Sequence, residues 1–390
     1  MNGFDAGPTG EIRELTYSLW ATLTTCALKA AFTRDKRTRS LDRGGVRSAL
    51  GTARHRTVEA VAAGRHGGLD APSPDWVRQE FGRLLDAERA RLVREWHPAK
   101  VPSTGTWPDV AVTRARLARE LGSKDGVAWP RGDPGPGAPV TRRTSAHSPA
   151  ENPRLHLGES AVEVSLEDDR RGLRGRIDRL ENRDGQLVVV DLKSGIGADR
   201  DYLAQQHRRQ MLFYAGLVEA NYGNWPALEL QPVTGASVTI EYRASDVEQI
   251  RADAQASRAT FNAADASGSV AHLVVASVER CAWCPFQVVC PALGRDWSAV
   301  ASSRHRAVTL ARGIVSAVRR QDQSTDVVLE QRTDLTAPAG TVTVTRLPHE
   351  SDIRVGDEFS VSRVALAGND HVLRAGWDSL IWVHRPGPPQ

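Results

Sequence analysis

The chain has 390 residues, of which 40% are hydrophobic and 25% charged, a composition typical of globular proteins and unlike that of disordered or fibrous chains. Basic residues (51) exceed acidic residues (47) only slightly, so the overall charge does not require a polyanionic partner. No apolar run approaches the roughly 18 residues of a membrane span, and no signal-peptide core stands at the N-terminus. We therefore expect a cytoplasmic protein with no membrane partner.

The first part of the chain is predicted to be helical. Apolar residues at helical spacing predict a helix over residues 11–33, and a second early helix contains Gly51-Thr-Ala-Arg-His55. Ser73-Pro74-Asp75 predicts the start of another helix, with Ser as the N-cap, and one more is expected near 108–121. The Gly-, Pro- and Ser-rich stretch 122–153 predicts a flexible loop or linker.

One segment within this part is locally basic. From Arg34 to Arg56 it holds eight Lys or Arg residues and two acidic residues. Such a stretch is either a solvated surface or a stripe that faces phosphate groups, and the sequence leaves both interpretations open.

The middle of the chain changes to strand periodicity. Leu173 to Leu180 and Gln186 to Lys193 predict two strands joined by the turn Asn182-Arg-Asp-Gly185. A helix is expected over about 201–221 and a strand near 236–242. Ser245-Asp-Val-Glu248 then has the pattern of a capping box that opens another helix.

Short β segments dominate the C-terminal part. They cover residues 325–384 and predict a small all-β domain of the OB or SH3-like kind over 301–390. Basic and aromatic residues there could bind single-stranded nucleic acid, although core packing or a protein-docking role explains the tryptophans equally well. These residues are Arg354, Arg363, Arg374, Trp377, Trp382 and His384.

Acidic residues gather on the predicted hairpin. A turn at 182–185 places Asp178 opposite Val189, one diagonal step from Asp191. Alternation along the strand places Asp191 and Lys193 on the same face. Two carboxylates suit Mg²⁺ or Mn²⁺, and a lysine beside them can orient an attacking water. A surface hairpin with ordinary ion pairs would show the same pattern.

Two predicted helices carry polar residues that are further candidates for this site. Gln210 and Tyr214 are spaced i, i+4, so they project from one face of the helix that follows the hairpin, with His207 one turn earlier. His55 could be a further metal ligand, although a lone histidine is more often a structural residue.

The four cysteines suggest a second metal site. Cys281, Cys284 and Cys290 stand close together, and Cys26 is the only cysteine left to complete a set of four ligands. Four thiolates can hold either Zn²⁺ or a [4Fe-4S] cluster.

Taken in order, these motifs resemble the RecB-like branch of the PD-(D/E)XK nuclease superfamily, and specifically its iron–sulfur members. Those members include CRISPR-associated exonucleases and the nuclease domains of helicase–nucleases. The matching motifs are Leu15-Thr-Tyr-Ser-Leu19 with Cys26, Gly51-Thr-Ala-Arg-His55, Gly175-Arg-Ile-Asp178, Val190-Asp191-Leu192-Lys193, Gln210-x-x-x-Tyr214 and the C-terminal cysteine triplet.

The resemblance implies an α/β fold with a PD-(D/E)XK restriction-endonuclease-like core, a central mixed sheet flanked by helices, over residues 1–300. Asp178, Asp191, Lys193, Gln210 and Tyr214 would be the catalytic residues. Lys193 would assist the attacking water, and Gln210 with Tyr214 would steady the site. The Mg²⁺ or Mn²⁺ ligands would be His55, Asp178, Asp191 and the carbonyl of Leu192. Glu159 is a candidate for an additional upstream acidic position.

The resemblance also implies a function. The expected activity is that of a metal-dependent deoxyribonuclease, an exonuclease rather than an endonuclease, acting on single-stranded DNA or DNA ends in repair, recombination or antiviral defence. A helicase or another repair or defence protein is the expected partner. Cys26, Cys281, Cys284 and Cys290 would bind a structural [4Fe-4S] cluster in preference to Zn²⁺. The alternatives are a catalytically idle DNA-binding scaffold of the same fold and a zinc protein without enzymatic activity.

Overall fold

The structure is a computed structural model of the chain. It describes residues 9–42, 44–62, 64, 72–95, 101–107, 109–122, 155–158, 160–193, 200–232, 237–282, 284–295, 310–322, 324–331, 340–348, 352–367 and 369–385. The predicted loop at 122–153 lies outside these residues except for Gly122, which ends a helix. Among the described helices, none combines the length and apolarity that a membrane crossing needs.

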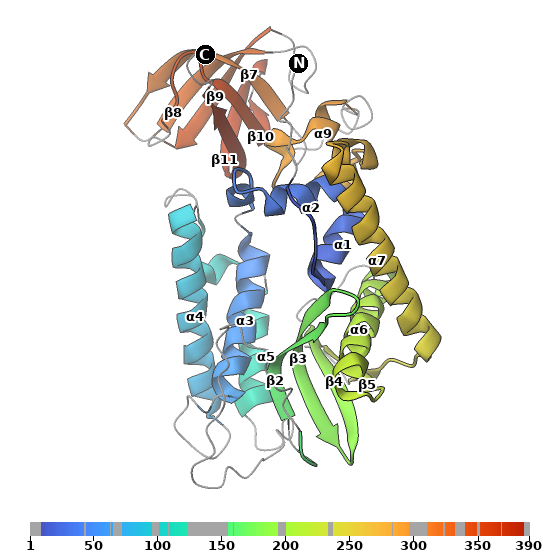
Figure 1. Ribbon diagram of the computed structural model, residues 1–390. Coiled ribbons are helices and arrows are strands. Elements are labelled where there is room, and N and C mark those ends of the chain that lie inside the picture. The colour runs from blue at the N-terminus through green and yellow to red at the C-terminus, as the bar shows by residue number, and fades with distance from the viewer. Residues whose placement is uncertain are drawn as a thin grey trace.

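A mixed β-sheet organises the lower part of the molecule (Figure 1). Its strand order is β1-β3-β4-β5-β6, with β2 also paired to β3. The β1–β3 and β4–β5 pairs are parallel, and the other pairs are antiparallel. The prediction of an α/β fold with a central mixed sheet is therefore confirmed. The strands are β1 (Leu15–Thr16), β2 (Ser160–Asp168), β3 (Leu173–Arg183), β4 (Gln186–Lys193), β5 (Ala227–Pro232) and β6 (Val238–Thr239).

Two long helices cover the sheet. Helix α6 (Arg200–Tyr222) contacts β2 to β5, and α7 (Ala244–Ala266) packs against α6 (Figure 1). All eight residues from Met211 to Val218 are buried, so this part of α6 is apolar on every side. Its position between the sheet and α7 explains that composition.

The predicted helix at 11–33 is divided into a strand and two helices. Leu15 and Thr16 form β1 beside β3, and the Thr16 hydroxyl accepts a hydrogen bond from the Leu19 N–H, which caps α1 (Tyr17–Thr25). Cys26 is extended, and α2 (Ala27–Arg34) follows it. Apolar spacing continues through both breaks, so periodicity alone could not reveal them.

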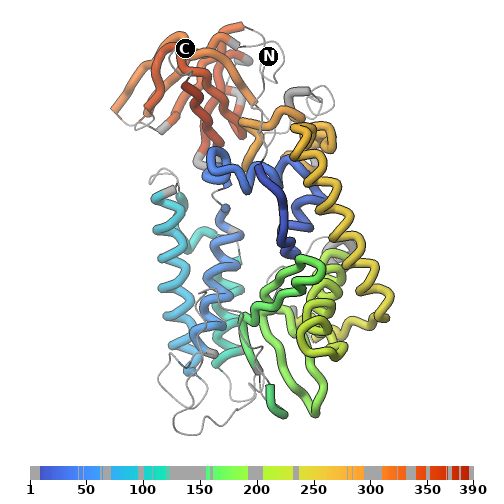
Figure 2. The backbone as a smooth tube through the Cα atoms, viewed as in Figure 1, coloured from blue at the N-terminus to red at the C-terminus, as the bar shows by residue number. Residues whose placement is uncertain are grey.

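Three further helices form a separate bundle, α3 (Val46–Ala62), α4 (Pro74–Glu95) and α5 (Val110–Gly122). In the backbone tube of Figure 2 they stand beside the sheet at its β2 edge. They bury a hydrophobic cluster of their own, which includes Phe81, Leu85 and Leu117. The Ser73 hydroxyl accepts a hydrogen bond from the Trp76 N–H, so the predicted helix start is confirmed. The short helices η1 (Arg39–Leu41) and η3 (Thr104–Thr106) lie before α3 and α5.

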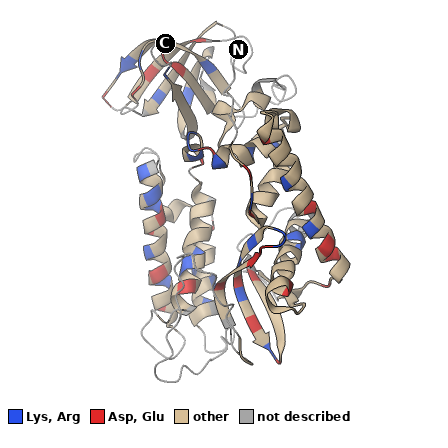
Figure 3. Ribbon diagram, in the orientation of Figure 1, with Lys and Arg blue, Asp and Glu red and all other residues tan. Residues whose placement is uncertain are grey.

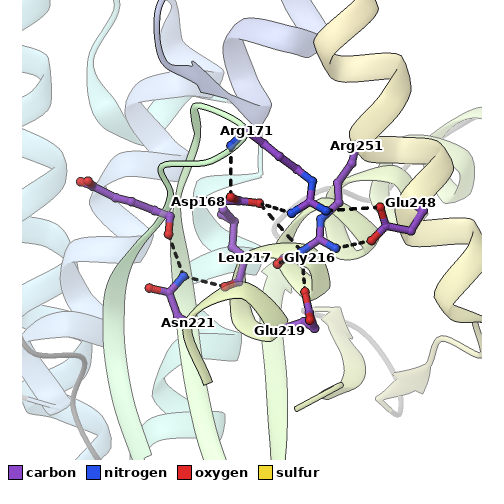
Figure 4. Close-up of polar contacts among 9 residues, drawn as sticks. Asp168, Arg171, Gly216, Leu217, Glu219, Asn221, Glu248 and Arg251 are labelled. Carbon is purple, nitrogen blue, oxygen red and sulfur yellow. Dashed lines mark hydrogen bonds and ion pairs between the residues drawn. The ribbon is translucent and has the colours of Figure 1, made fainter. Parts of the chain in front are cut away.

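An ion-pair network centred on the buried Asp168 and Arg251 joins the end of β2 to α6 and α7 (Figure 4). Arg251 of α7 is 3% exposed; it donates to the Gly216 carbonyl at 2.5 Å and pairs with Glu219 at 2.8 Å and with Glu248. Asp168 pairs with Arg171 at 3.1 Å and lies 4.0 Å from Arg251. The network therefore fixes the long helices relative to the sheet.

The region after β4 corrects two sequence predictions. The strand expected near 236–242 is only the two-residue β6, and β5 was not predicted. Helix α7 begins at Ala244, and its capping carboxylate is Asp246, which accepts from the Arg243 N–H. The predicted capping box at Ser245–Glu248 is therefore wrong by two residues. Four short helices follow, η4 (Val270–Leu273), α8 (Val278–Cys281), η5 (Gln287–Val289) and α9 (Pro291–Arg295).

The C-terminal strands close into a barrel with the order β10-β11-β9-β8-β7. Its β11–β9 pair is parallel, and its other pairs, including the closing β10–β7 pair, are antiparallel. The all-β character of this part is as predicted, although β7 was missed. The strands are β7 (Leu310–Arg320), β8 (Ser324–Gln331), β9 (Gly340–Pro348), β10 (Glu358–Ala367) and β11 (Asn369–His384).

The contact between β3 and α6 depends on Gly175. A Cβ at this position would lie 2.5 Å from Leu217 Cδ1 and 3.2 Å from Tyr214 Cε1, and both side chains are buried. We expect Gly175→Ala to lower the free energy of unfolding by about 1–3 kcal/mol, measured from the urea midpoint. Gly82→Ala is the control, because no atom lies within 4 Å of its Cβ and alanine favours a helix by roughly 1 kcal/mol. Equal midpoints for the two variants would contradict this account of the packing.

Candidate functional site

The β3–β4 hairpin positions the predicted carboxylates. Asp184 and Gly185 have φ values of 53° and 88°, and they form a two-residue turn between Arg183 and Gln186. The last ladder pair away from the turn is Arg179 with Val190. Continued by one residue, this register places Asp178 directly opposite Asp191, and Val189 faces Leu180 instead, so the prediction that Asp178 faces Val189 is wrong. The shift is two residues, which leaves both carboxylates on the predicted face.

An irregularity in the neighbouring strand pair lies at the same place. The β2–β3 ladder pairs Val162 with Arg179 and Val164 with Ile177, but Glu163 and Asp178 between them are not paired. Glu163 has a φ of 55°, which is strained for a residue other than glycine. Leu180 and Ile177 both join the core cluster that contains α6, although they have opposite parity. The ladder keeps the same register on both sides of this gap, so the positive φ of Glu163 is a local distortion at the point where Glu163 and Asp178 lie side by side.

The carboxylates of Glu163 and Asp178 lie close to a histidine of the helical bundle. Ligand atoms of His55, Glu163 and Asp178 all lie within 4.8 Å of one another. They line a small pocket, completed by Val58 and Glu59 among others, with a volume of about 10 Å³. That is room for roughly one water-sized body. The structure brings together the predicted residues His55 and Asp178, and it adds Glu163, which sequence reasoning missed.

Asp191, Gln210 and Tyr214 lie beside this group. Asp191 is 2% exposed on β4, and the Gln210 amide donates to the Tyr214 hydroxyl at 3.0 Å on α6. Burial raises the pKa of Tyr214, and the negative charges of Asp191 and Asp178 raise it further. The phenol therefore stays protonated and can donate a hydrogen bond in this neighbourhood.

The structure gives the backbones of two predicted residues, Leu192 and Lys193. The backbones of Leu192 and Lys193 belong to β4, opposite Gln231 and Pro232 of β5, and their side chains lie outside the described residues. Position 193 has the parity of position 191 along the strand. Glu159, the candidate for an upstream acidic residue, lies outside the described residues altogether.

Carboxyl groups crowd the pocket. The pKa of Glu163 is raised to about 7, chiefly by burial; the ion pair with Arg176 opposes this rise, and the neighbouring carboxyls of Glu59 and Asp178 add to it. A divalent cation would relieve this repulsion, and carboxylate oxygens with one imidazole are suitable ligands for Mg²⁺ or Mn²⁺. The donor set therefore fits the implied metal. Glu163 stands between Val162 and Val164 in an alternating strand, which was the sequence signal available for finding it.

The four cysteines gather at the opposite end of α1. Cys26 lies between α1 and α2, Cys281 ends α8, and Cys284 and Cys290 lie between α8 and α9; all four are partly buried, and none forms a disulfide. Burial raises the pKa of Cys284 to about 12, and the charges of Cys26 and Cys281 act on it as neighbours. Backbone N–H groups donate to the sulfurs of Cys26, Cys284 and Cys290. The structure therefore brings together all four predicted cysteines.

The donor set of this second site is four thiols. Among the described residues, no three cysteine sulfurs all lie within 4.8 Å of one another. Four thiolates can hold either Zn²⁺ or an iron–sulfur cluster, so the residues present fit both groups.

Comparison with protein families gives one match. Residues 14–291 match the model described as the PD-(D/E)XK nuclease superfamily, which is more than half of the chain. The match ends one residue after Cys290 and leaves the barrel outside it. No curated protein matches the chain significantly.

The pKa of Glu163 predicts how stability depends on pH in the metal-free protein. Because the folded-state pKa is about 7 and the ordinary value is 4.5, the contribution of Glu163 is fully present below pH 4.5 and is lost as the pH rises through 7. We expect Glu163→Gln to reduce the fall in the thermal midpoint between pH 5 and pH 8, measured with a chelator present. Glu167→Gln, on the exposed part of the same strand, is the control. An unchanged pH profile for Glu163→Gln would contradict the assignment.

Proposed function

The chain belongs to the PD-(D/E)XK nuclease superfamily, and from this premise we propose that it is a metal-dependent deoxyribonuclease. The observation that carries the proposal is the convergence of His55, Glu163 and Asp178, with ligand atoms within 4.8 Å of one another, beside the strand that holds Asp191. This group combines hard oxygen donors with one imidazole in a pocket of the right size for a single ion.

We assign the residues as follows. His55, Asp178, Asp191 and the Leu192 carbonyl hold Mg²⁺ or Mn²⁺, and Glu163 is a further ligand. When bound, the metal lowers the pKa of a water and neutralises charge on the phosphate. Lys193 orients the attacking water. Gln210 fixes the Tyr214 hydroxyl, which stays protonated and can donate to a phosphate oxygen.

We propose single-stranded DNA or DNA ends as the substrate, and exonuclease rather than endonuclease activity. The support is the resemblance of the motifs to RecB-like nucleases. Within the basic segment 34–56, Arg37 pairs with Asp35 and Arg56 with Glu88, whereas Lys36 and Arg39 are exposed. Figure 3 shows basic residues on the helices above the sheet. Lys36 and Arg39 are the members of the segment that we expect to face DNA.

The wider role follows from the same resemblance. We propose that the protein acts in the cytoplasm in DNA repair, recombination or antiviral defence, together with a helicase or another protein of these pathways. For the barrel we propose the OB type, supported by five strands and by the parallel pairing of its third and fifth strands. Trp382 packs against the main core and Arg363 is buried, so we exclude both from any DNA-binding surface of the barrel.

The cysteines are proposed to bind a structural [4Fe-4S] cluster. The resemblance of the motifs to iron–sulfur nucleases supports a cluster over Zn²⁺, and the N–H groups that donate to three of the sulfurs suit thiolate ligands. The cluster would connect Cys26, which joins α1 to α2, to the loop that follows α8. Its role would be to hold the N-terminal helices against the end of the nuclease core.

Nuclease activity can be tested with end-labelled single- and double-stranded DNA in the presence of Mn²⁺. We expect Lys193→Ala and Asp191→Asn each to lower the cleavage rate by at least about 100-fold, because each removes a group that activates or holds the reacting water. Asp184→Asn is the matched control, since Asp184 lies exposed in the same hairpin and asparagine suits its positive φ. Equal cleavage by all four proteins would point to a contaminant. DNA binding without cleavage by the wild type would favour the idle scaffold.

The proposed cluster can be tested by measuring the metal and sulfide content of the purified protein. We expect the purified protein to absorb visible light and to contain iron and acid-labile sulfide. We expect Cys281→Ala to be colourless and poorly soluble, because one of four ligands is lost and α1 is no longer fixed to the core. Zinc in place of iron would overturn the cluster, and a fully soluble Cys281→Ala variant would overturn its structural role.

A further inference from the structure

The C-terminal barrel packs directly on the loop that carries three of the cysteines. We define this loop, Cys281–Cys290, as the cysteine loop; its helix η5 contacts β7, β10 and β11. Leu310 and Leu380 of the barrel belong to the same hydrophobic cluster as Phe286, Val288 and Val289 of the loop, and not to the core of the barrel itself. The barrel and the cysteine loop therefore share a buried interface.

Arg363 of β10 reaches from the barrel to a cysteine carbonyl. Its guanidinium donates to the Cys284 carbonyl oxygen at 3.1 Å, and the residue is only 9% exposed. Its φ is 58°, at an irregularity of the β10–β11 ladder between Ser362 and Val364, and its own carbonyl accepts from the Ser379 hydroxyl at 2.9 Å. A strained backbone is thus held in place so that this side chain points at the cysteine loop.

Arg312 of β7 makes a second contact of the same kind. It donates to the Val288 carbonyl at 2.7 Å and to the Ser360 hydroxyl at 2.9 Å, and Ser360 is 2% exposed. The loop also has an internal support, because the fully buried Gln287 amide donates to the carbonyls of Cys281 and Ala282. The backbone between Cys281 and Cys290 is therefore held from inside by Gln287 and from the barrel by two arginines.

We propose that the barrel is a structural part of the thiol site, and that Arg363 and Arg312 are positioning residues that hold the cysteine loop in its ligand-binding conformation. Outer residues of this kind orient metal ligands, and their loss commonly weakens metal binding 10- to 100-fold. Both contacts are made to backbone carbonyls, so they fix the path of the chain at Cys284 and just before Cys290. This inference rests on the proposed iron–sulfur centre but assigns residues that lie outside the matched region 14–291.

The test uses the full chain with its cluster. We expect Arg363→Gln and Arg312→Gln to bind less iron per chain and to release it to an excess of a ferrous chelator about 10-fold or more faster than the wild type. Arg374→Gln is the matched control, because Arg374 is an exposed barrel arginine on β11. It should release iron at the wild-type rate. Near-UV circular dichroism of each variant reports whether the barrel is still folded.

The outcomes separate this inference from the proposed function. Wild-type iron content and release in both folded variants would overturn the positioning role, even if the wild type cleaves DNA and carries a cluster. If Arg363→Gln does not fold, the iron release of Arg312→Gln tests the positioning role. This variant is expected to fold, because Arg312 is only partly buried. A wild type without iron overturns the premise and the inference together, whereas loss of DNA cleavage alone leaves both standing.

Discussion

The crowding of carboxyl groups around Asp178 is the constraint on which the rest of the nuclease core depends. Glu163, Asp178 and Asp191 lie on the three neighbouring strands β2, β3 and β4, and burying charged carboxylates is unfavourable without a compensating proton or cation. The strained backbone of Glu163 places one of them there, and α3 supplies the histidine from a bundle with its own core. A site that is destabilising when empty and neutralised by one divalent ion is typical of a fold selected for metal binding.

Aromatic packing connects this site to the thiol site. Tyr17 and Trp20 of α1 contact Phe213, which in turn contacts Tyr214, with ring centroids 5.9–6.4 Å apart. The Tyr17 hydroxyl also donates to the Gln206 carbonyl of α6 at 2.7 Å. Because α1 ends at Cys26, whatever fixes that cysteine also fixes the helix that holds α6 and its Tyr214 in place. A structural metal centre remote from the chemistry can therefore stabilise the catalytic site through one helix.

The sequence predicted the residue types of both sites and the hairpin, because alternation, turn residues and cysteine spacing are local signals. It could not predict the breaks in 11–33, since the stripe of Leu15, Leu19 and Leu23 continues through a strand and a helix cap. It also missed Glu163, whose role depends on a left-handed backbone and on a histidine more than 100 residues away in the chain. The two-residue error in the hairpin register did no harm, because alternation repeats every two residues.

The two candidate sites have donors of opposite character, which would direct different metals to each. Oxygen and imidazole donors beside Asp178 favour hard divalent cations, whereas four thiolates favour iron–sulfur clusters or zinc. The carboxylate site around Asp178 is built on strands and lines a pocket, as a catalytic ion would require. The four-cysteine site is built on short helices and a loop, and such a backbone needs support from neighbouring elements. The barrel arginines donate to the Cys284 and Val288 carbonyls, and in our proposal these contacts are why an all-β domain packs against the end of the nuclease core.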